Sequence, residues 1–181
     1  VSPGQLILES EAIHACTRSK NFVFLRMLLT VIATSEPTQC EKTRAKSEAL
    51  NHLDTEGLTP LMAFAEKAGG SNLEDGEDRK YCQFLINMGA DKNIVNLRNG
   101  LSALGTFRLK IQHEKQRQLM LFLPLRDEPE EALMEALLEP DHGETPADRA
   151  IRLEDIVDEV DEIEVDDDEG FFFEDDSDED Y

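Results

Sequence analysis

The feature that most constrains the fold of this chain is a five-residue pattern that recurs at a fixed interval. It begins at Gly57 as Gly-Leu-Thr-Pro-Leu, returns at Gly100 as Gly-Leu-Ser-Ala-Leu, and returns at Gly143 as Gly-Glu-Thr-Pro-Ala, an interval of 43 residues each time. Recurrence at about 20 to 50 residues is typical of repeat proteins, in which one small structural unit stacks on the next. The sequence therefore predicts a repeated unit.

The residue types within one unit predict a turn followed by two helices. Glycine permits the positive φ of a tight turn, Thr or Ser then caps a helix, and proline fits its first position. Leu61 and Leu104 would face the core from this helix. A second helix is predicted over 79–87, where apolar residues recur at three- and four-residue spacing before Gly89. Because such a pair cannot bury its apolar face alone, neighbouring units must stack.

Gly-x-Thr-Pro-Leu, a second helix and then Gly-Ala-Asp-x-Asn together resemble the ankyrin repeat, most strongly over residues 54–104. The resemblance implies an all-α fold, a short solenoid of helix pairs, that binds other proteins. The repeats are degenerate, because the family's unit is about 33 residues long and an interval of 43 requires insertions. The residues that carry the motif are Gly57, Thr59, Pro60, Leu61, Gly89, Ala90, Asp91, Asn93, Gly100, Ser102, Leu104, Gly143, Thr145 and Pro146.

We expect an ankyrin-like domain over residues 1–164, with the best-matched repeats over 51–139. Helical patterns cover 6–17 and 22–34, and His14 lies where the family has a structural histidine. A linker is expected over 36–49, further helices over 109–123 and 130–138, and a capping helix over about 146–163. Residues 165–181 are expected to form a disordered acidic tail.

The charge of the chain lies almost entirely at one end. The formal net charge is −22, and residues 127–181 hold 26 acids against two bases, whereas residues 1–126 are close to neutral. Acidic runs of this kind usually stay disordered and raise solubility. Phe171, Phe172 and Phe173 indicate a binding role in addition to solubility, because exposed aromatic side chains tend to anchor partners. The tail resembles those of histone-binding chaperones, and Ser177 resembles an acidophilic kinase site.

No pattern in the sequence points to catalysis. The four histidines are scattered, and we find no phosphate-binding loop, nucleophile motif or metal-ligand spacing. We therefore expect no enzyme activity, catalytic residue, cofactor or metal. Three cysteines without ligand spacing favour free thiols, and no apolar run is long enough to span a membrane. We expect an intracellular monomer, cytoplasmic or nuclear.

The function that these patterns favour is a protein-interaction module or scaffold, whose partner is another protein. By their place in the repeat, the candidate partner-binding residues are Met62, Ala63, Arg98, Asn99, Thr106 and Phe171 to Phe173. Two alternatives stay open: a chaperone or competitor for histones or other basic proteins, and an inhibitor that masks a transcription factor. The basic residues Arg108, Lys110, His113, Lys115 and Arg117 favour a solvated helix face over nucleic-acid binding, because the acidic tail would compete with phosphates.

Overall fold

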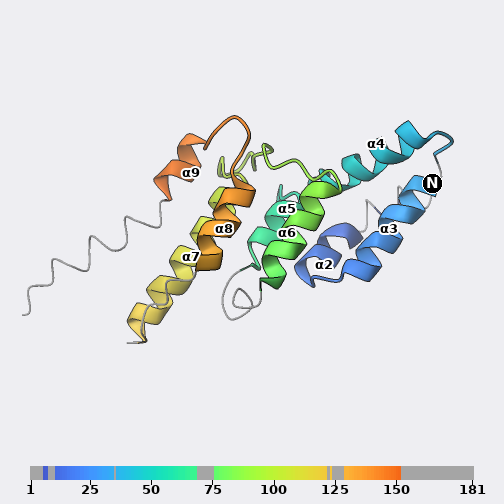
Figure 1. Ribbon diagram of the computed structural model, residues 1–181. Coiled ribbons are helices and arrows are strands. Elements are labelled where there is room, and N and C mark those ends of the chain that lie inside the picture. Colours follow the sequence, from blue (N-terminus) through green and yellow to red (C-terminus); the bar gives the residue numbers. More distant parts are fainter. Residues whose placement is uncertain are drawn as a thin grey trace, which may run out of the picture.

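The computed structural model describes residues 6–7, 11–34, 36–68, 76–121, 123 and 129–151, and every regular element in these residues is a helix. An all-helical fold is thus confirmed for the described part of the chain (Figure 1). In chain order the helices are α2 (Ala12–Arg18), α3 (Phe22–Thr34), α4 (Gln39–Leu50), α5 (Pro60–Ala65), α6 (Glu77–Asn87), α7 (Ala103–Met120), α8 (Pro129–Leu138) and α9 (Pro146–Ala150).

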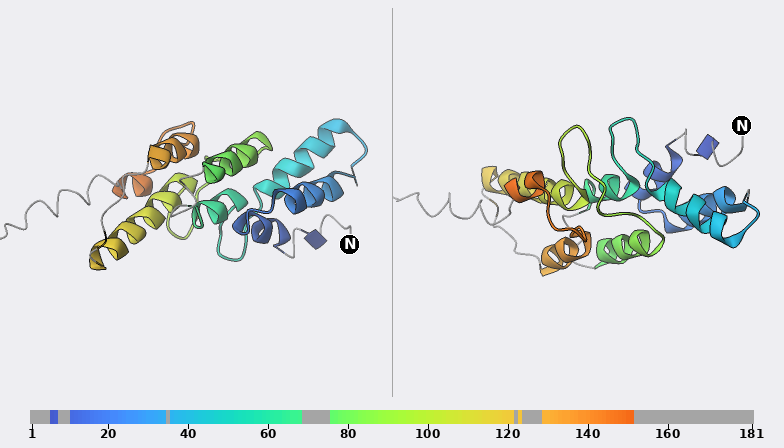
Figure 2. Two further views of the ribbon diagram at one scale, coloured as in Figure 1. Left: turned by 60° about the horizontal axis from the view of Figure 1, so that its bottom comes forward. Right: turned by 90° about the horizontal axis from the view of Figure 1, so that it is seen from above.

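The helices form two layers that run side by side along the molecule. Helices α2, α5, α7 and α9 contact one another in that order and make the first layer. Helices α3, α6 and α8 belong to the second, and each contacts its preceding partner in the first layer, in the pairs α2 with α3, α5 with α6, and α7 with α8. Figure 2 shows the turns before α5 and before α7 projecting together from the side of the first layer that faces away from α6 and α8.

The recurring pattern forms the start of each first-layer helix that follows it. Gly57, Gly100 and Gly143 have φ angles of 78°, 73° and 82°, values that favour glycine. Two residues after each glycine, a hydroxyl side chain caps the next helix by accepting a hydrogen bond from a backbone amide. The caps are Thr59, Ser102 and Thr145, and Pro60 and Pro146 open their helices at a position that needs no amide donor.

The core is continuous from α2 to α8 and centres on α5. All six residues of α5 are buried, because this short helix is packed between α2, α7 and α6. Phe64, Tyr81 and Phe107 are each 0% exposed, and Leu61 and Leu104 are buried as the sequence predicted. Phe22 carries the core into α3, because its ring lies 4.3 Å from that of Tyr81 in an edge-on arrangement.

The segment expected to be a linker is instead a helix, α4. Its start carries a capping box, in which the Thr38 side chain accepts from the Glu41 amide and the Glu41 carboxylate accepts from the Thr38 amide. Most of α4 is polar, so hydrophobic spacing gives no helix signal, yet Ala49 and Leu50 at its end are fully buried. Helix α4 contacts α3 and extends that end of the molecule.

The C-terminal expectations are met only in part. Helix α9 begins at Pro146 as predicted but ends at Ala150, and Ile151 leaves helical geometry with φ −107° and ψ 62°. The rest of the predicted capping helix, 152–163, lies outside the described residues. The tail 165–181, with Phe171, Phe172, Phe173 and Ser177, also lies outside them.

Candidate protein-binding surface

Two turns, residues 54–58 and 96–101, project from one side of the first layer (Figure 2), and we call them the turn edge. In the first turn the Asp54 amide donates to the Leu58 carbonyl at 2.9 Å, and the Asp54 carboxylate accepts from the Leu58 amide at 2.9 Å. The second turn closes in the same way, with the Asn96 amide donating to the Leu101 carbonyl at 2.9 Å. It holds one residue more between its polar first residue and its glycine.

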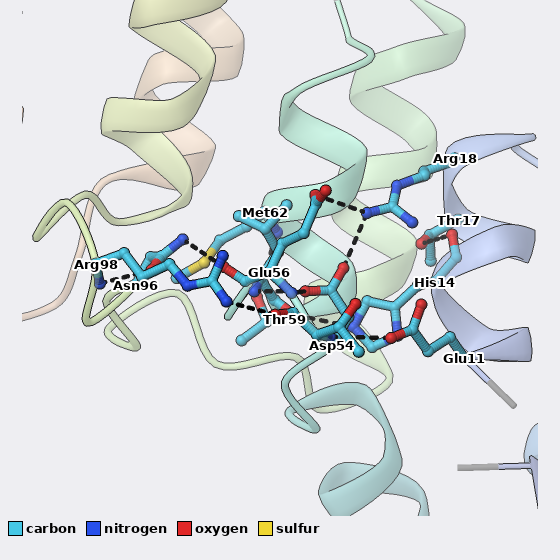
Figure 3. A network of polar contacts seen from close by, with 12 residues as sticks. Glu11, His14, Thr17, Arg18, Asp54, Glu56, Thr59, Met62, Asn96 and Arg98 are labelled. Atoms are coloured by element: carbon cyan, nitrogen blue, oxygen red, sulfur yellow. Dashed lines mark hydrogen bonds and ion pairs between the residues drawn. The ribbon is translucent and has the colours of Figure 1, made fainter. Parts of the chain in front are cut away.

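The first and second turns are joined by hydrogen bonds between their tips. The Asn96 side-chain amide donates to the Glu56 carbonyl at 3.3 Å, and the Arg98 guanidinium donates to the Thr55 carbonyl at 2.6 Å. From the other side, the guanidinium of Arg18 on α2 lies 2.9 Å from the Asp54 carboxylate (Figure 3). The first turn is therefore held between α2 and the second turn.

Beneath the first turn lies a buried polar contact, which we call the N-terminal joint. His14 is 1% exposed, and its Nε2 lies 3.0 Å from the Leu58 carbonyl oxygen, which can only accept, so Nε2 carries the proton. Burial lowers the pKa of His14, and the bond to Leu58 opposes this only in part. Although burial disfavours its charged form, the amides of Leu58 and Glu56 lower the pKa of Asp54.

A second buried contact, the C-terminal joint, connects α7 to α9. Asp148 is 0% exposed, and its carboxylate accepts from the Ser102 amide at 3.0 Å and from the Ser102 hydroxyl at 2.7 Å. The same carboxylate accepts from the Thr145 amide at 3.2 Å. Gly105 makes room for it, because an added Cβ at that position would lie 1.9 Å from Asp148 Oδ1.

Arg108 completes the C-terminal joint. Its guanidinium lies 2.8 Å from Glu135 on α8 and 2.9 Å from Glu144, and it reaches the Asp148 carbonyl at 3.4 Å. Although burial opposes the charge, the hydrogen bonds to Glu135 and Glu144 raise the pKa of Arg108. Its 9% exposure corrects the expectation that it belongs to a solvated basic face.

Other members of the expected basic face are also paired with carboxylates. Lys115 lies 2.9 Å from Glu131 on α8, and Lys110 forms an ion pair with Glu114 one turn along α7. Lys115 thus connects α7 to α8, whereas the Lys110 pair lies within α7. The sequence could not show this, because Glu131 and Glu135 lie in a different helix that sequence reasoning treats separately.

Asparagines connect the segments that follow α4, α6 and α8. The Asn51 carboxamide accepts from the Asp91 amide at 2.7 Å and donates to the Gly89 carbonyl at 3.0 Å. Forty-two residues later, Asn93 accepts from the Asp141 amide at 2.8 Å. The predicted motif residues Gly89, Asp91 and Asn93 thus lie in contacts between successive units, and Ala90 is buried.

The expected partner-binding residues do not share one surface. Arg98 and Asn99 are exposed at the tip of the second turn, and Thr106 is half-buried. We expected Met62 and Ala63 to be exposed, but they are 1% and 0% exposed, because α5 is packed between α2, α6 and α7. Sequence reasoning missed Leu97, which is 86% exposed beside Arg98. The sequence signal that could have identified Leu97 is an apolar residue between polar ones in a predicted turn.

Two hollows lie on opposite sides of the molecule. Beside the turn edge is a polar hollow of about 370 Å³, lined by Glu11, Arg18, Asp54, Thr55, Glu56, Glu66 and Lys67. Between α6 and α8 lies a larger one of about 640 Å³, which we call the outer groove, lined by Arg79, Lys80, Gln83, Phe84, Asn87, Leu133, Ala136 and Leu137. The first is strongly charged, whereas the second combines apolar and basic side chains.

Within the described ranges, no group of three or more His, Cys, Asp or Glu side chains could hold a metal ion. Cys16, Cys40 and Cys82 are free thiols, and burial raises the pKa of Cys82 to about 12. None of the helices in the described part of the chain is long and apolar enough to cross a membrane. Comparison with protein-family models, with curated proteins and with solved structures finds no match to this chain.

Proposed function

We propose that this chain is a non-enzymatic protein-interaction module, built as a short ankyrin-like solenoid that presents its turn edge to another protein. The observation that carries the proposal is the hydrogen bonding of Asn96 and Arg98 to the neighbouring turn. A turn held in this way displays Leu97, Arg98 and Asn99 with little freedom to lose on binding, and preorganisation of this kind favours affinity.

The chemistry of the turn edge indicates the kind of partner. Leu97 offers one exposed apolar contact, and Arg98 and Asn99 surround it with polar groups, as in the anchor and rim of a protein interface. The polar hollow beside the tips holds four carboxylates and two cations. A partner with a small apolar pocket and basic groups at its margin fits this surface.

The test is affinity capture with the full chain and two matched variants. Leu97→Ser removes the apolar tip, whereas Met120→Ser removes a similarly exposed apolar side chain (79%, against 86% for Leu97) at the far end of α7. We expect quantitative mass spectrometry to find partners that wild type and Met120→Ser retain and that Leu97→Ser loses. If Leu97→Ser retains every partner that Met120→Ser retains, the turn edge is not the binding surface.

A second candidate function rests on charge. From Glu154 to Tyr181 there are 17 acids and no base, with three adjacent phenylalanines among them. A segment of this composition suits capture of histones or other basic proteins, with the acids accelerating encounter and the aromatic rings holding the complex. Histone affinity should be measured across salt concentrations for the whole chain and for a chain ending at residue 164. Equal affinities would exclude this function.

A further inference from the structure

The outer groove differs from the rest of this acidic chain. The described residues that line it include two cations and four apolar side chains but no carboxylate, in a protein with 40 acids. Phe84 and Leu137 are half-buried, and Leu133 is 43% exposed. A volume of about 640 Å³ lies within the range of roughly 300–1,000 Å³ that ligand pockets occupy.

The carboxylates of α8 are directed elsewhere. Glu131 and Glu135 pair with Lys115 and Arg108 on α7 instead. Glu130 of α8 lies 3.3 Å from Arg79 at the end of the groove, and Glu77 of α6 lies 2.8 Å from Lys80, so each cation has one carboxylate beside it. The side chains of Arg79 and Lys80 remain 43% and 63% exposed at one end of the groove. The groove thus presents an apolar floor with a basic end.

One segment of the chain has the complementary chemistry. Phe171, Phe172 and Phe173 are flanked by Asp166 to Glu169 on one side and by Glu174 to Asp176 on the other. Aromatic rings fit an apolar floor, and the neighbouring carboxylates fit the exposed ends of Arg79 and Lys80. We propose that the outer groove binds the chain's own Phe171–Phe173 segment.

The length of chain between the two sites permits this contact. Nineteen residues lie between Ile151 and Phe171, and a flexible linker of that length has a root-mean-square span of about 25 Å. Helix α9 contacts α7 and α7 contacts α8, and neighbouring helix axes lie roughly 8–10 Å apart. The groove therefore lies within the ordinary reach of the tail, at an effective concentration on the order of millimolar.

Two other hollows fit the tail less well. The polar hollow contains Glu11, Asp54, Glu56 and Glu66, which repel an acidic segment. A hollow of about 450 Å³ on α3, lined by Val23, Arg26, Met27, Thr30 and Val31, is apolar and basic. It lies at the opposite end of the molecule from α9 (Figure 1). The outer groove alone among these three combines suitable chemistry with a short path from Ile151.

The contact is independent of the turn edge, so either proposal can fail without the other. Its consequence is competition: a basic partner that captures the tail must first displace Phe171–Phe173 from the groove. Occupancy of the groove would weaken apparent affinity of the tail for such a partner by the fraction of chains in which the tail is free.

Photo-crosslinking in the full chain tests the proposal. A photoreactive benzophenone amino acid replaces Leu133 in the groove or, as a control, Met27 on α3, both of which are exposed. We expect Leu133 to crosslink to residues 165–181 within one chain, at monomer mass, and Met27 to give far less. Absence of a tail crosslink from Leu133, a crosslink only at dimer mass, or equal yields from both positions would overturn the proposal.

Two charge variants sharpen the result. Lys80→Glu reverses a cation at the basic end of the groove, and Lys67→Glu makes the same change in the polar hollow on the other side. Lys80→Glu should lower the Leu133 crosslink yield about threefold, the size expected for an exposed ion pair. Lys67→Glu should leave it unchanged. Equal effects of the two variants would show that only general charge attraction is at work.

Discussion

The N-terminal and C-terminal joints solve the same packing problem with opposite chemistry. Each connects a first-layer helix to a neighbouring unit through one fully buried polar side chain, His14 in the first and Asp148 in the second. His14 is kept neutral and uses a single hydrogen bond to a carbonyl. Asp148 accepts three hydrogen bonds, and Arg108 with its two carboxylates closes the site around it. A buried neutral side chain is satisfied by one hydrogen bond, whereas a buried carboxylate requires several donors around it.

The largest effect is expected from Asp148→Ala, which removes the acceptor on which the C-terminal joint depends. The buried amide and hydroxyl of Ser102 lose their partner, and the capping box at Thr145 loses one half. We expect the free energy of unfolding to fall by about 3 kcal/mol, measured by urea denaturation followed by circular dichroism. Glu139→Ala removes an exposed carboxylate nearby and is the control. Equal stability of the two variants would contradict the role given to Asp148.

Arg108→Ala tests whether the supporting groups matter. It removes the cation that lies between Glu135 and Glu144, two carboxylates that keep some contact with water. We expect a loss of about 2 kcal/mol, less than for a fully buried pair because of that exposure. Adding Glu144→Gln should restore part of it. Arg44→Ala, which breaks the exposed pair with Glu48, should change unfolding little, and a similar loss there would count against a special role of Arg108.

The N-terminal joint should make stability depend on pH in a way that the other does not. Because the pKa of His14 is lowered in the fold, the unfolded chain binds a proton at His14 at pH values where the folded chain does not. Stability from this group is therefore complete above the unfolded pKa of about 6.5 and falls as the pH drops below it, by at most about 1.4 kcal/mol per pH unit.

His14→Gln keeps a side-chain N–H that can donate to Leu58 but cannot titrate. It should flatten the dependence of unfolding free energy on pH just below neutrality, whereas His52→Gln, at an exposed position, should keep the wild-type slope. Unfolding curves recorded at several pH values decide this. An unchanged slope in His14→Gln would mean that other groups produce the dependence.

The smallest effect is expected at the tip of the turn edge. Arg98→Ala removes one exposed hydrogen bond to the Thr55 carbonyl, and we expect a loss within about 0.5 kcal/mol, as for most surface positions. Asn96→Ala changes the residue that starts the second turn, and it should lower the free energy of unfolding more than Arg98→Ala. If Arg98→Ala proved as damaging as Asp148→Ala, the distinction between buried joints and exposed tips would be wrong.

Local chemistry made much of the fold predictable. The glycine turns, the hydroxyl caps and the prolines at helix starts depend on a few adjacent residues, so the sequence pattern indicates them directly. Helix α3 has the predicted bounds because its sequence is an almost continuous apolar run of helical length. Helix α4 was not predicted, because its polar sequence has almost no apolar periodicity. The capping box formed by Thr38 and Glu41 is a sequence signal that could have indicated its start.

The candidate surface was harder to predict because exposure depends on packing between distant segments. Met62 and Ala63 belong to a helix only six residues long, and its enclosure by three other helices cannot be inferred from spacing within it. Arg108 pairs with residues 27 and 36 positions away. A cluster of basic residues in sequence therefore gave no sign that its members face different neighbours.

The contact between Gly105 and Asp148 ties two positions of the chain together in any history of substitution. Both residues stand five places after a turn glycine, in successive units. A methyl group at position 105 would occupy the place of the Asp148 carboxylate, so such a change is acceptable only after residue 148 has become smaller. Removing the carboxylate first discards its bonds to Ser102. Each substitution made alone therefore lowers the stability of the fold. Where stability is limiting, the two residues are expected to change together or not at all.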